Sequence, residues 1–160
     1  MGSPTKIGVD TGMSNPALYV DQYINAADRV FTSGTYGGNM TWGTPLSPQI
    51  VFCNATSGEV RFTGTILGWG ILVVKGSLRI SGNFSFHGLV IGYNDLGLEK
   101  DTLALSTGTP EIIGGLLMAG NSGSRFEMKG NDKIVYSKDA LELAKYINKL
   151  QAYRVVKWFE

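Results

Sequence analysis

The stretch Glu59–Gly76, EVRFTGTILGWGILVVKG, decides the fold, because the next stretch, Ser77–Gly92 (SLRISGNFSFHGLVIG), repeats its pattern. Each stretch has an apolar-Arg-apolar strand, a hydroxyl-glycine turn, a second short strand, another glycine and an apolar triplet. Three landmarks recur at a spacing of 18 residues: Gly64 and Gly82, Gly70 and Gly88, and Ile71 and Leu89. A period near ~20 residues with several short strands per unit is typical of a solenoid, whose units bury their apolar sides by stacking.

The repeat continues less strictly on both sides. Leu103–Thr109 and Phe126–Asn131 give the strand and turn again, Gly115–Met118 gives the triplet, and Gln49–Phe52 resembles an earlier triplet. An inserted segment, Tyr93–Asp101, lengthens one step of the repeat. We therefore expect roughly four to five coils, stacked ~4.8 Å apart.

The predicted fold class is mainly β: a short single-stranded parallel, right-handed β-helix solenoid with flanking N- and C-terminal α-helices. Ile71, Leu89 and Leu116 are expected to lie over one another in a shared interior. The alternative is an antiparallel meander or sandwich with hairpins at Thr63–Thr65, Ser81–Asn83 and Lys129–Asn131. Alternation and turn spacing alone do not exclude it, but the 18-residue spacing favours the solenoid.

Residues 1–13 are polar and rich in glycine, and are expected to be a tag remnant or a disordered segment. Residues 14–160 are expected to form a single β-helix domain. Within it we predict a helix and linker over 14–40, coils over 41–136, a capping helix over 137–150 and a final strand over 151–160.

The two predicted helices are Ala17–Phe31 and Lys138–Leu150, the second with Ser137 as its N-cap. Thr41–Pro48 is expected to be an extended lead-in whose prolines bar ordinary sheet pairing. A solenoid exposes unpaired backbone groups at both ends. We expect the amphipathic helices to cover these ends.

Composition excludes several classes of protein. The 160 residues are 43% hydrophobic and 17% charged, with 22 glycines, which suits one β-rich domain. A net charge of +1 gives no electrostatic basis for binding nucleic acid or an anionic membrane. The single cysteine, Cys53, excludes an intrachain disulfide and a cysteine-based zinc site, and is expected to be a buried apolar residue.

The repeat places the single histidine, His87, where Trp69 stands one coil earlier. This equivalence predicts an aromatic position on the coil surface, and the repeat brings no serine or carboxylate to it, so no catalytic residue is expected. Arg61 and Arg79 are predicted outward neighbours whose column ends at Ala104, which indicates a solvated face. The candidate surface binding residues are Trp69, Phe86, His87, Arg61 and Arg79.

The inserted segment carries three carboxylates, Asp95, Glu99 and Asp101. Carboxylate oxygens suit calcium, but no known calcium-loop pattern surrounds them, so a solvated loop is expected. We therefore predict neither a metal site nor a cofactor.

Several segments together resemble the C-terminal region of bacterial PilX-type pilus assembly proteins. They are WGTPxxPQIV at 42–51, GILVVxG at 70–76, LxISGNFxFHGLVI at 78–91 and YRVxxW at 153–158. The resemblance implies a minor-pilin-like protein with a hydrophobic N-terminal segment and a periplasmic or extracellular body. It supplies no catalytic residues. The present sequence does not include the membrane segment, which would precede it in the full-length protein.

These observations favour a non-enzymatic structural or adhesion domain of an exported, pilus-associated protein. Its expected partners are other pilus or minor pilin proteins or a cell-surface ligand, and not nucleic acid. The alternative is a carbohydrate-binding or carbohydrate-active β-helix protein. A third hypothesis is end-to-end self-assembly, as in polymer-forming bactofilins, against which the predicted capping helices argue.

Overall fold

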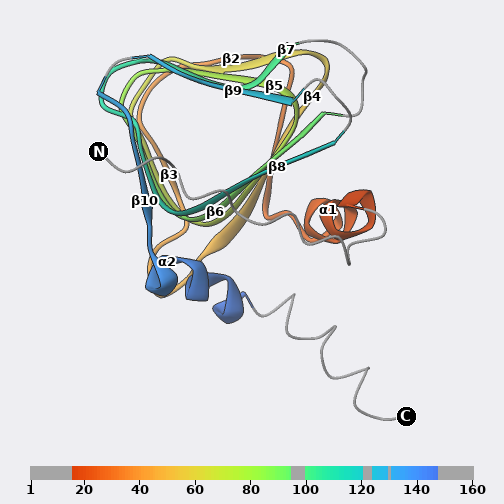
Figure 1. The fold of residues 1–160 in the computed structure, drawn as a ribbon, viewed down its shortest axis with the longest axis vertical. Coiled ribbons are helices and arrows are strands. Elements are labelled where there is room, and N and C mark those ends of the chain that lie inside the picture. Colours follow the sequence, from red (N-terminus) through yellow and green to blue (C-terminus); the bar gives the residue numbers. More distant parts are fainter. Residues whose placement is uncertain (1–15, 95–99, 121–123, 130, 148–160) are drawn as a thin grey trace.

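The computed structural model describes residues 16–94, 100–120, 124–129 and 131–147. In this part of the chain ten strands form one sheet that winds about four turns into a three-sided solenoid (Figure 1). The strands are β1 (Arg29–Thr32), β2 (Gly34–Tyr36), β3 (Met40–Trp42), β4 (Gln49–Phe62), β5 (Ile66–Ser81), β6 (Phe84–Asn94), β7 (Lys100–Thr107), β8 (Glu111–Gly120), β9 (Ser124–Met128) and β10 (Lys133–Tyr136).

The long strands bend around corners, so one strand contributes to more than one side of the triangle. Face 1 stacks β1 on successive parts of β4, β5, β6 and β8. Face 2 stacks parts of β2, β4, β5, β7 and β9. Face 3 stacks parts of β3, β5, β6, β8 and β10. Each of these strand pairs is parallel, which confirms the solenoid and contradicts the antiparallel alternative.

Stacked glycines form the corner between faces 3 and 1. Gly70, Gly88 and Gly114 have φ angles of 126°, 142° and 139°, a region that side chains disfavour. A Cβ atom on Gly88 would collide with the carbonyl oxygen of Gly70, and one on Gly114 with that of Gly88. The 18-residue spacing of Gly70 and Gly88 therefore reflects one coil.

Alternate side chains of each face point into the triangle and form one interior cluster. In face 1 the register stacks Leu72, Val90 and Leu116 inside. In face 2 the interior includes Val60, Leu78 and Leu103, none of which is exposed. The interior is apolar throughout these columns, so stacking the coils removes apolar surface from water at each level.

The outward side of face 1 is also apolar and buried. Val20, Ile50, Phe52, Ile71, Val73, Ile91 and Ile147 form a second cluster, here called the outer cluster. The prediction that Ile71, Leu89 and Leu116 share the interior is therefore wrong. Ile71 and Leu89 do stack, but outside, and Leu116 stacks inside on Val90. In an all-apolar triplet, composition does not tell which residues point inward.

The helices cover this outward side of face 1, not the ends of the solenoid. They are α1 (Pro16–Asn25), α2 (Lys138–Glu142) and the short 3-10 helix η1 (Leu143–Tyr146). Figure 1, which looks along the solenoid, shows α1 and α2 outside the triangle. Val20 of α1 and Ile147 after η1 pack into the outer cluster. The prediction of long flanking helices that cap the ends is therefore wrong, because the helices bury the second apolar side of face 1.

Ser137 does cap α2, since its Oγ accepts a hydrogen bond from the Ala140 backbone N–H at 3.2 Å. The predicted first helix, in contrast, ends at Asn25 rather than at Phe31. Residues Arg29–Thr32 pair with Val51–Asn54 instead, so sheet pairing overrides the helical periodicity.

The coils begin at Arg29, earlier than the predicted residue 41. Thr41 and Trp42, which begin the lead-in expected to be unpaired, belong to β3, which pairs with Ile66–Gly68. The prolines come after β3 and leave its pairing intact. Pro45 lies in the turn that Thr44 and Ser47 close by mutual backbone hydrogen bonds, and Pro48 follows that turn. The predicted segments 1–13 and 151–160 lie outside the described residues.

Candidate functional site

A column of aromatic and apolar side chains runs along the outside of face 3. The register stacks Trp69 on His87, His87 on Ile113 and Ile113 on Val135. These four residues are here called the face 3 strip. Trp69, His87 and Ile113 are partly exposed, and Val135 is 44% exposed. The column extends over four successive levels, so it offers a narrow, flat contact surface.

Trp69 and His87 stack on one another as their equivalence in the repeat predicts. Their ring centroids are 5.5 Å apart and their planes differ by 17°. The His87 Nε2 atom also lies 3.4 Å from the Ser85 Oγ atom. Trp42 pairs with Gly68, so the next residue, Gly43, stands beside Trp69 in the preceding coil. Gly43 has no side chain that could extend the column. The side of the indole that faces away from His87 therefore has no column neighbour stacked on it.

Phe86 was predicted as a surface binding residue, and this prediction is wrong. Its side chain is completely buried in the interior, where it stacks on Phe84 at a centroid distance of 6.0 Å. The physical reason is alternation along the strand, which points Ser85 and His87 outward and Phe86 inward. Phe86 is therefore a packing residue.

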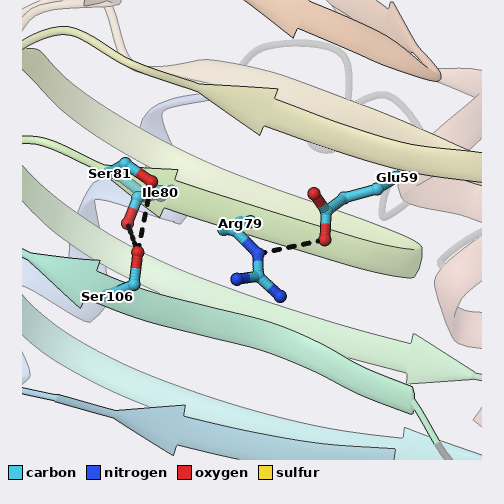
Figure 2. Close-up of polar contacts among 5 residues, drawn as sticks. All are labelled: Glu59, Arg79, Ile80, Ser81 and Ser106. Carbon is cyan, nitrogen blue, oxygen red and sulfur yellow. Dashed lines mark hydrogen bonds and ion pairs between the residues drawn. The ribbon is translucent and has the colours of Figure 1, made fainter.

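Arg61 and Arg79 are outward neighbours on face 2, and Ala104 follows them in the column. The Arg79 Nε atom donates to the Glu59 Oε2 atom at 3.1 Å (Figure 2). Their side chains are 40% and 37% exposed, so this ion pair contributes only ~0–1 kcal/mol. Arg61 is exposed. This arrangement fits the solvated face that the sequence predicts.

Hydroxyl groups link neighbouring coils near the next corner of face 2. Figure 2 shows the Ser81 and Ser106 Oγ atoms, which lie 3.1 Å apart. Ser106 Oγ also donates to the Ile80 carbonyl oxygen at 3.2 Å. These side chains satisfy each other and the backbone, so they support the coil geometry.

Two of the described carboxylates of the coils lie beside cations. Glu127 pairs with Lys129 at 2.9 Å, and Glu111 stands in register with Lys133. Of the predicted loop carboxylates, Asp95 and Glu99 lie outside the described residues, and Asp101 falls in β7. In the ranges that the structure covers, no three His, Cys, Asp or Glu residues are grouped so as to hold a metal ion.

Cys53 lies in the interior, and burial raises the pKa of its thiol well above the ordinary value. It stacks between Phe31 and Val74. A protonated, enclosed thiol packs like a small apolar side chain, which is the role that the sequence predicts.

Sequence reasoning found Trp69 and His87 but missed Ile113 and Val135. The inserted segment, which separates His87 and Ile113 by 26 residues instead of 18, hid the equivalence of these two positions. The glycine corners could have revealed this equivalence, because Gly88 directly follows His87 and Gly114 directly follows Ile113.

Compared with known proteins, the chain matches no family model, no curated protein and no solved structure. No helix in the described ranges has the length and apolarity needed to span a membrane.

Proposed function

We propose that this chain is a non-enzymatic structural and adhesion body of an exported, pilus-associated protein. In this proposal the solenoid winds right-handed, as connections between parallel strands almost always do. Its contacts are made by the outer surface of the coils, and chiefly by the face 3 strip. The proposed location is periplasmic or extracellular, with any membrane anchor in a preceding segment.

The observation that carries the proposal is the face 3 strip itself. Trp69 and His87 are held in a fixed stack, so presenting them to a partner costs little side-chain entropy. Aromatic side chains are enriched in the energetically dominant parts of protein interfaces. The strip is partly exposed along its length and stands on a rigid parallel sheet.

The pilus setting is supported by the resemblance described above. The resembling segments 42–51, 70–76 and 78–91 lie on consecutive coils. Segment 70–76 follows directly after Trp69 in β5, and segment 78–91 contains His87 in β6. The expected partners are therefore other minor pilins or pilus subunits.

The test is binding of the purified chain to minor pilins encoded beside it. We expect saturable binding that weakens at least roughly tenfold in a Trp69→Ala/His87→Ala variant, because aromatic anchors dominate such interfaces. Thr35→Ala, an exposed change on face 2, is the matched control and should bind normally. Circular dichroism establishes that each variant is folded.

Two outcomes would contradict the proposal. One is the absence of binding to any minor pilin. The other is Trp69-dependent binding to a glycan panel instead, which would favour the carbohydrate-binding alternative, because an exposed indole also suits sugar rings.

A further inference from the structure

Two exposed apolar residues stand at opposite ends of one outward column of face 1. The register gives the column Val30, Phe52, Val73, Ile91 and Leu117. Its three middle members are 6%, 0% and 2% exposed, whereas Val30 is 57% and Leu117 is 41% exposed. Val30 and Leu117 are exposed because the column stops at each of them, so each has a column neighbour on one side only.

An interior column is exposed at one of its ends only, because Trp42 at the other end is 0% exposed. It runs from Trp42 through Gly68, Phe86 and Ile112 to Ile134. Ile134 occupies an interior position but is 44% exposed, since no described residue lies beyond it in the column. Phe31, Tyr36 and Met40 at the first coil are likewise only partly buried against the interior. Both ends of the described solenoid therefore show apolar interior side chains.

The backbone edges at the two ends also match. β1, β2 and β3 pair only with the second coil, and β9 and β10 pair only with the coil before them, among the described strands. The helices do not lie across these edges in the view along the solenoid (Figure 1). Solenoid ends normally carry polar capping elements, because an open strand edge recruits another strand.

We propose that copies of this chain stack end to end, with the last coil of one on the first coil of the next. This head-to-tail contact continues the parallel pairing of all three faces. It sets Leu117 of one copy beside Val30 of the next. A twofold tail-to-tail contact would leave Val30 of both copies exposed, so the head-to-tail arrangement covers more of the exposed apolar surface. Because the contact is heterologous, it forms open filaments. It does not depend on the pilus setting.

Light scattering and sedimentation velocity of the full chain test this proposal over a wide concentration range. The wild-type chain should form oligomers that grow beyond a dimer as concentration rises. Val30→Lys and Leu117→Lys should each raise the concentration needed for association at least tenfold. Leu46→Lys is the matched control, because Leu46 is 97% exposed in the turn after β3 and belongs to no column.

A mixing experiment separates the two arrangements. The Val30→Lys chain keeps an intact last coil and the Leu117→Lys chain an intact first coil. Mixed together, they should form one-to-one dimers that grow no further, although each alone remains monomeric. If Val30→Lys alone dimerises, the contact is tail-to-tail and the proposal is wrong. A wild-type chain that stays monomeric at all concentrations also overturns it, and association that appears only after deleting residues 148–160 would show that the chain covers its own end.

Discussion

In this solenoid, the residue that fits at a given position depends on the side chains that lie one coil away. Gly68 is an example, because it stands in the interior column between two large rings. A Cβ atom on Gly68 would lie 2.5 Å from the Phe86 Cδ2 atom and 3.5 Å from the Trp42 Cε3 atom. Glycine is needed there for space, since the rings of Trp42 and Phe86 already fill the position that a side chain would occupy.

Gly68→Ala should therefore lower the free energy of unfolding by about 1–3 kcal/mol, the usual cost of overpacking. Urea denaturation followed by tryptophan fluorescence measures this change. Gly37→Ala is the control, because a Cβ atom there meets only the Thr63 Oγ1 atom at 3.4 Å. An equal effect of both substitutions would show that Gly68 is not crowded by the rings.

Phe86 and His87 are adjacent in sequence but lie on opposite sides of the sheet. Phe86→Ala should cost about 3–5 kcal/mol, because it empties a buried position. His87→Ala should cost less than about 1.5 kcal/mol, since it removes one partly exposed stacking contact. Thermal and urea unfolding of the two variants give the comparison, and a larger loss for His87→Ala would reverse the assigned orientation of β6.

At the scale of elements, face 1 is apolar and buried on both sides of the sheet. The run Ile71–Val74 is continuously apolar, which is typical of a strand buried on both sides. The 18-residue landmarks predicted the corners and the parallel stacking correctly. They could not predict where the helices lie, because an amphipathic helix can cover either a coil end or a sheet face.

Val20 tests the position of α1. It is 4% exposed and packs into the outer cluster, so Val20→Asp should lower the free energy of unfolding by at least about 2 kcal/mol through burial of a polar group. Its neighbour Asp21 is exposed, and Asp21→Asn should change stability by less than about 0.5 kcal/mol. Chemical denaturation measures both. If Val20→Asp were neutral, α1 would not cover face 1 in solution.

At the scale of the whole molecule, one register connects the interior, the face 3 strip and the columns that end at Val30 and Leu117. The sequence was sufficient to predict that Trp69 and His87 stack, because both lie within its two strictest repeats. It was insufficient for Phe86, for Val135 and for the first coil. Those depend on strand alternation, on the length of the inserted segment and on pairing with residues far along the chain.

The register itself is measured most directly by spin–spin broadening between labels on engineered cysteines. Native Cys53 is buried, and burial raises the pKa of its thiol, so it should remain unlabelled. Labels at Arg61→Cys and Arg79→Cys stand on adjacent strands, ~5 Å apart along the solenoid, and should broaden each other's spectra strongly. Labels at Arg61→Cys and Leu67→Cys lie on different faces and should interact weakly. Strong broadening of the second pair with none in the first would indicate a hairpin at Thr63–Thr65 and would contradict the solenoid.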